Sequence, residues 1–284
     1  PGDGDILVRI HAGSVTAGDC EIRRLQLPLM LGIPMRLYTG LFQPKRIPVL
    51  GQEFAGRVEK TGVNVRSFQE GDRVFGTTGF NFGANAEYIC IPEEPDDTQG
   101  TLACIPDNAS FKEAAVLPTA GLEAIHFIRS AAIKPGSRVL VIGGGGSIGT
   151  CSIQLANHFG ADVTGVDSTS KQNLMRQAGA HHTIDHTAGD NATRALPPFD
   201  LIIDVVGRKG VPHRLRLLKP GGTYFLAYAG LRHIMLSIWT SLTSRKKLLI
   251  QSSEQTREEF EYLVGLMQEG VLKPFIDRTF TLEQ

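Results

Sequence analysis

The stretch Val139-Leu-Val-Ile-Gly-Gly-Gly-Gly-Ser-Ile-Gly149 decides the fold of this chain. It matches the pattern G-x-G-x-x-G at Gly144, Gly146 and Gly149, between an apolar strand-like run and an amphipathic helical pattern. In that setting Gly144 allows a tight turn off the strand, and Gly146 lets the backbone approach a pyrophosphate. Gly149 lets the helix pack closely on the sheet. The stretch therefore predicts a βαβ unit that binds a dinucleotide, with a glycine-rich turn that binds nothing as the alternative.

The residues after the glycines predict how a nucleotide is held. Backbone N–H groups at the start of the helix, at Ser147 and Ile148, are expected to bind the pyrophosphate. The next strand-like run ends at Asp167, 18 residues after Gly149 and near the ~20 at which the fingerprint places an acid. A carboxylate there accepts the ribose hydroxyls of NAD and repels the extra phosphate of NADP, unless Asp167 is simply a helix N-cap. The residues that follow suit that phosphate instead, and they are Ser168, Thr169 and Lys171. The expected cofactor is thus NAD or NADP, with the choice open.

Strand and helix patterns alternate along the second half of the chain. The expected strands are residues 138–142, 162–166, 182–184, 201–206 and 223–227. Helices are expected near residues 147–159 and 170–178. Runs of strand, helix and strand at this pitch specify a parallel sheet with right-handed crossovers. The second half therefore predicts an α/β domain with a doubly wound parallel sheet.

The first half of the chain has a different texture. Short β-like runs alternate with glycine turns from residue 5 to about residue 92, which is typical of an antiparallel β domain. A capping box at Ser110 and Glu113 predicts a helix start. Pro118 is expected to interrupt the helical pattern, which resumes over residues 122–132. Near the end of the chain, a capping box that begins at Thr256 predicts an amphipathic helix that stops at Gly270.

Composition limits the function and the partners. A length of 284 residues favours two domains, and 29 Lys+Arg against 29 Asp+Glu leave no basic field for a nucleic acid. No apolar stretch approaches the ~20 residues that span a bilayer, so we expect no membrane and a small-molecule partner. The four cysteines are too far apart for a disulfide framework, which predicts a reducing compartment and a cytoplasmic location. Methyltransferases also carry a glycine loop followed by an acid, but the full glycine pattern and the β-rich first domain argue against that class.

Motifs spread over nearly the whole chain carry a family resemblance. They are residues 6–12 (Ile-Leu-Val-Arg-Ile-His-Ala), 48–56 (Pro-Val-Leu-Gly-Gln-Glu-Phe-Ala-Gly), 68–76 (Phe-Gln-Glu-Gly-Asp-Arg-Val-Phe-Gly), 86–88, 117–121 (Leu-Pro-Thr-Ala-Gly), the glycine loop, 154–156, 200–207 and 218–222 (Leu-Lys-Pro-Gly-Gly). With them the chain resembles the medium-chain dehydrogenase/reductase superfamily, specifically its zinc-independent quinone oxidoreductase-like branch. The resemblance implies a GroES-like catalytic domain over residues 1–117 and 252–284, and a Rossmann domain over residues 118–251. The family's opening strand and its final helix and strand are missing, so we expect a truncated form.

The resemblance also bears on zinc and on the reaction. Zinc alcohol dehydrogenases of the superfamily bind the metal through Cys and His, and the matching positions here are Thr16 and Gln52. Glu53 alone cannot hold the metal, so we expect no zinc and a structural role for Glu53. Without a Lewis acid, an electron-poor acceptor is the easier substrate. The resemblance thus implies an NAD(P)H-dependent oxidoreductase that transfers hydride to a quinone, enone or related carbonyl. The alternatives are a nucleotide-binding protein with an accessory role and little catalysis, and an alcohol dehydrogenase.

Further site residues follow from the resemblance. Those expected near the nicotinamide are Thr119, Val206, Gly207 and Ala227. The expected catalytic residues are Thr16 and Asp19 from one loop, and Tyr38 as a proton donor or quinone contact. Glu123 stands where the family commonly has Thr. The apolar stretch 231–242 is expected to form a helix or lid over an apolar pocket, or to pack on the sheet or on another subunit. Dimers are usual in the family, so a homodimer is among the expected assemblies.

Overall fold

The computed structural model describes residues 1–24, 33, 37, 47–95, 99–188, 196–207, 210–227, 230–250 and 253–282. The chain divides into two compact units. The first unit consists of Pro1–Leu122 and Glu254–Gln284, and the second unit of Glu123–Ser253. The division expected from the sequence sets the corresponding boundaries at 117/118 and 251/252.

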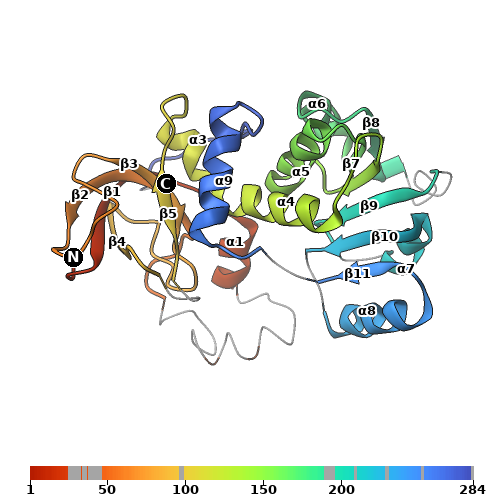
Figure 1. Ribbon diagram of the computed structural model, residues 1–284, viewed down its shortest axis with the longest axis horizontal. Helices are drawn as coiled ribbons and strands as arrows, with labels where there is room; N and C mark the ends of the chain where they lie inside the picture. The colour runs from red at the N-terminus through yellow and green to blue at the C-terminus, as the bar shows by residue number, and fades with distance from the viewer. Residues whose placement is uncertain are drawn as a thin grey trace. The chain divides into compact units, whose positions relative to one another are not determined.

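The first unit is built on a five-stranded antiparallel sheet in the order β4-β1-β2-β3-β5 (Figure 1). Its strands are β1 (Asp5–Gly13), β2 (Glu53–Thr61), β3 (Arg73–Thr77), β4 (Tyr88–Pro92) and β5 (Leu102–Cys104). Apolar side chains on one face of the sheet form the core, among them Ile6, Val8, Phe54 and Val74. The sequence analysis does not identify β5, because three residues are too few to show an alternating pattern. The predicted antiparallel β domain is confirmed.

Among the described residues, the helices that lie wholly in the first unit are α1 (Ala17–Arg24), α3 (Phe111–Ala115) and α9 (Arg257–Gln268). Ser110 and Glu113 form the predicted capping box at the start of α3. Pro118 begins a new helix, α4 (Pro118–Ala131), whereas the sequence predicts that the helical pattern resumes only at Leu122. Proline is well suited to a first helical position, because the N–H that it lacks would have no partner within the helix. Helix α9 starts at its Thr256 cap and ends before Gly270, whose φ is 70°.

The second unit is built on a six-stranded parallel sheet in the order β11-β10-β9-β6-β7-β8. The strands are β6 (Arg138–Ile142), β7 (Asp162–Asp167), β8 (His182–Asp185), β9 (Phe199–Asp204), β10 (Leu218–Leu226) and β11 (Lys247–Leu249). This order is that of the doubly wound nucleotide-binding fold. Five of the strands are those predicted, and β11 is the addition. The predicted α/β fold, with a β-rich antiparallel domain and a Rossmann-like parallel domain, is therefore confirmed.

Helices cover both faces of the parallel sheet, with α5 and α6 on one face and α8 on the other (Figure 1). The helices of this unit are α5 (Ser147–His158), α6 (Gln172–Gln177), α7 (Val211–Arg214) and α8 (Leu231–Thr243), with short 3-10 turns η1 (Thr169–Lys171), η2 (His186–Ala188) and η4 (Leu215–Leu217). In one core cluster, Leu140 and Ile202 of the sheet pack with Val211 and Leu215. Among the described residues, no helix is both long and apolar enough to span a bilayer. None of the four cysteines, all of which lie among these residues, forms a disulfide.

Candidate functional site

The glycine loop joins β6 to α5 at the carboxyl end of the parallel sheet. Gly143 is the residue in the left-handed conformation, with φ 80°, so the tight turn lies one residue earlier than the Gly144 that the sequence analysis selects. The N–H groups of Gly143 and Gly144 both donate to the carbonyl of Val166 in the adjacent strand β7, at 2.9 and 3.1 Å. The loop is thereby fixed to the sheet before the helix begins.

Two glycines at the start of α5 serve different purposes. A Cβ on Gly149 would lie 2.2 Å from the carbonyl oxygen of Gly143, so the close packing of helix and loop requires glycine there. Gly146 is the exposed N-cap residue, and a Cβ on it would meet Gly143 at an ordinary 3.5 Å. Gly146 supplies no side-chain cap, and the first-turn N–H groups of Ser147 and Ile148 have no acceptor within the helix. This bare helix start fits a pyrophosphate group, which is held by such N–H groups and by the helix dipole.

Asp167, at the end of β7, lies against the glycine loop. Its Oδ2 accepts the N–H of Gly145 at 2.9 Å, and its Oδ1 accepts the N–H of Ser168 at 2.7 Å. Lys171 packs against the same glycine loop, because a Cβ on Gly145 would be 2.5 Å from the Cβ of Lys171. Thr169 instead donates its hydroxyl hydrogen bond to Asp185. Of the four residues predicted around the ribose, the structure therefore brings Asp167 and Lys171 to the loop and engages the Thr169 side chain elsewhere.

A buried carboxylate that the sequence analysis misses organises the next loop. Asp204, at the end of β9, is fully buried with 0% exposure. Its Oδ1 accepts the N–H groups of Val206 and Gly207, at 3.1 and 2.8 Å. Its Oδ2 accepts hydrogen bonds from Arg214 and from the Tyr224 hydroxyl, at 2.7 and 2.6 Å. Burial and the neighbouring Asp204 carboxylate hold the pKa of Tyr224 above its usual range, so Tyr224 stays a hydrogen-bond donor.

The Asp204 contacts bring the predicted nicotinamide residues of the second unit to one edge of the sheet. Val206 packs on the glycine loop, since a Cβ on Gly143 would lie 3.0 Å from its Cγ2. Ala227 follows β10 and donates its N–H to the Asp204 carbonyl at 3.1 Å. The signal that could have identified Asp204 is a single acid closing the apolar run 201–203, followed two residues later by Val206-Gly207.

In the first unit, Glu53 is a buried carboxylate at the start of β2, and it contacts the first turn of α4. It accepts the N–H of Thr119 at 2.7 Å and a hydrogen bond from the Ser14 hydroxyl. Burial raises the pKa of Glu53, although the hydrogen bonds from Ser14 and Thr119 counteract the shift in part. A carboxylate is stabilised at a helix N-terminus, so Glu53 fixes the position of Thr119.

Thr16 and Asp19 cap the start of α1. Asp19 Oδ2 accepts the N–H and the hydroxyl of Thr16, both at 2.8 Å, and Thr16 Oγ1 accepts the N–H of Asp19 at 3.1 Å. The other oxygen of the buried Asp19 accepts the N–H of Gly51 at 3.2 Å. The structure thus brings the two residues together, and it shows Asp19 joining α1 to the segment before β2.

Two family profiles match most of the chain. One, described as an alcohol dehydrogenase GroES-like domain, matches residues 2–125, and the other, described as a zinc-binding dehydrogenase, matches residues 147–269. The chain belongs to the medium-chain dehydrogenase/reductase superfamily.

Within this superfamily the chain is similar to quinone oxidoreductases. It is 29% identical over 300 residues to the quinone oxidoreductase of Sus scrofa, covering 100% of this chain and 84% of the relative. It is 36% identical over 184 residues to a 2-methylene-furan-3-one reductase of Solanum lycopersicum, covering 62% of this chain and 45% of the relative. The solved structure of the quinone oxidoreductase from Coxiella burnetii superposes with a TM-score of 0.83 at 28% identity, over 99% of this chain and 84% of that one. The predicted resemblance is confirmed.

The two residues that match zinc-ligand positions of the superfamily, Thr16 and Gln52, form hydrogen bonds within the protein. The Thr16 hydroxyl donates to Asp19, and the Gln52 amide donates to the Gly79 carbonyl at 3.4 Å. Glu53 is satisfied by Ser14 and Thr119. In the part of the chain that the structure describes, no three His, Cys, Asp or Glu side chains gather as a metal site. The donors present at these positions do not fit a catalytic zinc ion, which is bound through three N, S or O ligands.

The remaining predicted residues are placed as follows. Tyr38 lies outside the described residues. Glu123 accepts the N–H and the hydroxyl of Ser253, at 3.1 and 3.2 Å, and burial raises its pKa. Glu123, which stands where the family commonly has Thr, therefore has Ser253 as its hydrogen-bond partner.

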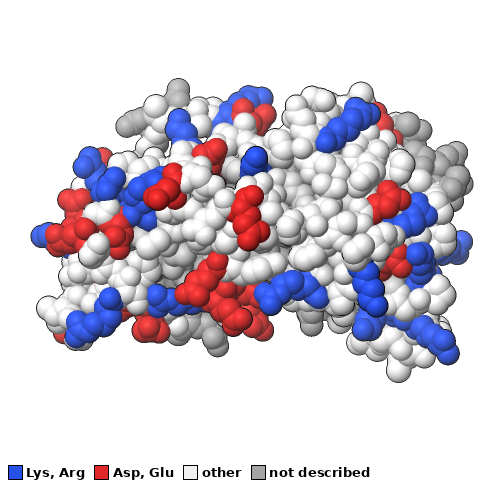
Figure 2. Space-filling view, turned by 45° about the horizontal axis from the view of Figure 1, so that its top comes forward, with Lys and Arg blue, Asp and Glu red and all other residues white. Residues whose placement is uncertain are grey.

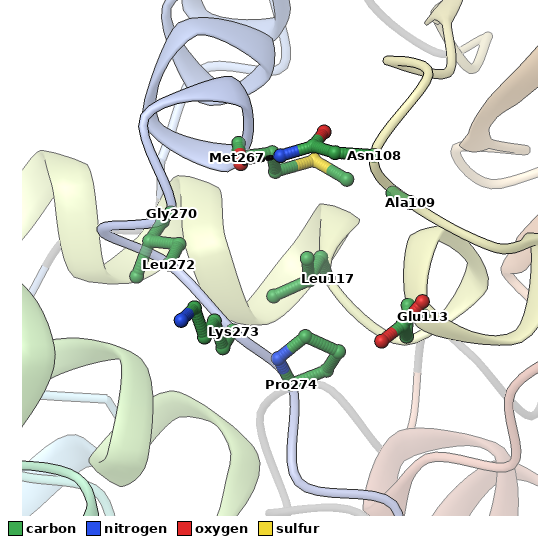
Figure 3. A pocket seen from close by; sticks show the side chains of 9 residues that line it. All are labelled: Asn108, Ala109, Glu113, Leu117, Met267, Gly270, Leu272, Lys273 and Pro274. Atoms are coloured by element: carbon green, nitrogen blue, oxygen red, sulfur yellow. Dashed lines mark hydrogen bonds between the residues drawn. The ribbon is translucent and has the colours of Figure 1, made fainter.

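A small cavity lies in the first unit, between the end of α9 and the start of α4 (Figure 3). Its volume is about 110 Å³, below the ~300 Å³ at which small-molecule sites begin. The lining residues are Asn108, Ala109, Glu113, Leu117, Met267, Gly270, Leu272, Lys273 and Pro274. None of the predicted site residues is among them, so we do not assign this cavity to the substrate.

The two glycines of the helix start are predicted to respond differently to substitution. Gly149→Ala should lower the free energy of unfolding by about 2–4 kcal/mol, because its methyl group would overlap the Gly143 carbonyl. Gly146→Ala should change stability by less than about 1 kcal/mol, yet weaken NADPH and NADH binding by covering the helix start. Urea unfolding and a binding titration measure the two effects. Equal loss of stability in both variants, or normal nucleotide binding by Gly146→Ala, would contradict these roles.

Glu53 should give stability a specific pH dependence. Its raised pKa means that the folded state binds the proton more tightly than the unfolded chain does. Its contribution to stability is therefore present below the ordinary pKa of 4.5 and is lost as pH rises through the folded pKa. We expect Glu53→Gln, which does not titrate, to gain stability relative to the native protein as the pH rises above 4.5. Urea unfolding at several pH values measures this difference.

Glu113→Gln is the matched control for Glu53→Gln. The hydrogen bonds from Ser110 lower the pKa of Glu113, so this variant should lose stability relative to the native protein as pH rises. If the stability difference from the native protein changed with pH in the same direction in both variants, the burial of Glu53 would not be its cause.

Proposed function

We propose that the protein is a zinc-independent NAD(P)H-dependent oxidoreductase that transfers hydride to a quinone, an enone or a related carbonyl compound. The observation that carries the proposal is the uncapped helix start at Gly146, fixed beside the Asp204-bound loop that holds Val206 and Gly207. Membership of a dehydrogenase/reductase superfamily supports it. So do the names of two relatives, because a quinone and a 2-methylene-furan-3-one both carry a carbonyl conjugated with a C=C bond.

The residues of the second unit would hold the cofactor, which supplies the hydride when it is bound. The N–H groups of Ser147 and Ile148 would bind the pyrophosphate, and Gly146 leaves the backbone bare for that contact. Asp167 and Lys171 would lie beside the adenosine ribose. The carboxylate of Asp167 would repel a 2′-phosphate, and the ammonium group of Lys171 would attract it. Ser168 and Thr169 are the further residues that we assign to this end of the cofactor. Thr119, Val206, Gly207 and Ala227 are the residues we assign to the nicotinamide end.

The acceptor would be oriented and protonated by residues of the first unit. Thr16 and Asp19 are held in one geometry by their mutual hydrogen bonds, so their contribution is a preorganised polar group. Tyr38 is the proposed proton donor or quinone contact. A conjugated acceptor is already electron-poor, so hydride transfer to it requires less activation than an isolated carbonyl does. This suits a site in which Thr16 and Gln52 stand at the zinc-ligand positions. A small-molecule acceptor, a cytoplasmic location and a homodimer belong to the same proposal.

Turnover assays test the proposed reaction. Purified protein is mixed with NADPH or NADH and a panel of quinones and enones, and oxidation of the cofactor is followed by absorbance. We expect turnover with a conjugated acceptor, unchanged after dialysis against a metal chelator. Turnover that depends on stoichiometric zinc would instead favour an alcohol dehydrogenase. Tight nucleotide binding with no turnover on any acceptor would favour the accessory nucleotide-binding role.

Asp167 is predicted to decide between NAD and NADP. Asp167→Ser and Asp167→Asn should both raise the affinity for NADPH relative to NADH about tenfold, because a carboxylate near a 2′-phosphate costs on the order of 1–4 kcal/mol. The Asn variant keeps an acceptor for the Gly145 N–H, and so separates the charge from the support of the loop. Asp185→Asn is the control, since this acid closes the neighbouring strand β8 and bonds Thr169. An unchanged affinity ratio in both Asp167 variants would contradict the assigned role.

A further inference from the structure

Helix α8 (Leu231–Thr243) has an inverted pattern of polarity. The residues that it buries most deeply are the polar His233 and Thr240, each 7% exposed. Ser237 also faces inward, and donates its hydroxyl to the carbonyl of Leu248 in β11 at 2.5 Å. Leu236 packs on the core of the second unit, but the other inward-facing residues named here are polar, whereas a helix that packs on a sheet ordinarily buries a continuous apolar stripe.

The solvent-exposed face of α8 is a continuous apolar stripe. The side chains recur every three or four residues and are 39% to 79% exposed; they are Leu231, Ile234, Met235, Ile238, Trp239 and Leu242. Isolated exposed apolar residues are ordinary on a protein surface, whereas a contiguous stripe indicates an interaction site. Trp239 is the single tryptophan of the chain.

The charge around α8 has one sign. Residues 205–253 contain nine Lys and Arg and no Asp or Glu, although the whole chain has equal numbers of each sign. Arg232 lies on α8, and Arg245 and Lys247 follow it, all three exposed. The acid that precedes this segment, Asp204, is fully buried and bound to Arg214. Figure 2 shows Lys and Arg bordering an uncharged surface at its lower right.

These features favour an anionic surface over a second copy of the chain. A two-fold contact through α8 would pair the same patch on both copies and bring their Lys and Arg side chains together, with no acid in residues 205–253 to compensate. A helix of 13 residues is about 20 Å long, which is too short to cross a bilayer but long enough to lie on one. An apolar stripe that carries Trp, flanked by Lys and Arg, is the composition of a helix at a membrane interface.

We propose that α8 binds the surface of an anionic lipid bilayer. The apolar stripe lies at the boundary between headgroups and acyl chains, and Arg245 and Lys247 contact the anionic headgroups. Such a contact with the membrane surface needs no spanning helix, and none is found in the part of the chain that the structure describes. The proposal does not depend on the proposed reductase activity, and its test uses neither cofactor nor substrate.

The fluorescence of Trp239 tests the proposal directly, because no other tryptophan contributes. The full chain is mixed with vesicles of phosphatidylcholine alone or with phosphatidylserine added. We expect a blue shift of the emission, protection from acrylamide quenching and co-sedimentation with the anionic vesicles only. High salt should weaken the binding, since the attraction of basic residues to anionic lipids is screened.

Variants separate the two components of the contact. Ile238→Asp with Leu242→Asp should abolish co-sedimentation, and Arg245→Glu with Lys247→Glu should reduce the partition coefficient at least about tenfold. Val63→Asp is the control, because Val63 is an apolar side chain of the first unit with 74% exposure, and this variant should bind as the native protein does. Circular dichroism confirms that each variant is folded.

Two results would overturn the proposal. One is native protein that leaves anionic vesicles with an unshifted Trp239 spectrum and stays in the supernatant. The other is a dimer, seen by sedimentation velocity, that Ile238→Asp dissociates while vesicle binding is absent; this would assign the face to a second copy.

Discussion

The arrangement of the loops at the carboxyl end of the parallel sheet depends on the carboxylate of Asp204. It is removed from water, and such a group is stable only when its oxygens are fully hydrogen-bonded. Its four partners come from the loop after β9, from α7 and from β10: Val206, Gly207, Arg214 and Tyr224. One side chain therefore fixes the loop beside the glycine turn, and through Tyr224 it also joins β9 to the adjacent strand β10.

The first unit uses the same device in Glu53. This carboxylate joins Ser14, at the end of β1, to the first turn of α4. Along the chain it directly follows Gln52, which matches a zinc-ligand position of the superfamily. A side chain next to that position can thus contribute through its hydrogen bonds alone, by fixing the helix start that carries Thr119.

Much of the fold could be predicted from the sequence, because its signals are local. The glycine loop, the apolar strand runs and the caps at Ser110 and Thr256 each depend on neighbours along the chain. The misplaced features depend on tertiary contacts. The turn falls at Gly143 because Val166 of the adjacent strand accepts both loop N–H groups. Asp204 was missed because a buried acid is recognisable only by its partners, two of which lie 10 and 20 residues further along the chain. Thr16 and Asp19 could be paired in sequence, but their joint role in capping α1 required the structure.

The hydrogen bonds between Glu123 and Ser253 have a consequence for how this architecture can be assembled. These residues are the first and the last of the second unit, so its two ends are held at one point. A module whose ends meet can be inserted into a host chain, or exchanged between hosts, at little cost in loop-closure entropy. The Rossmann-like unit therefore contains the hydrogen bonds that hold its own two ends together.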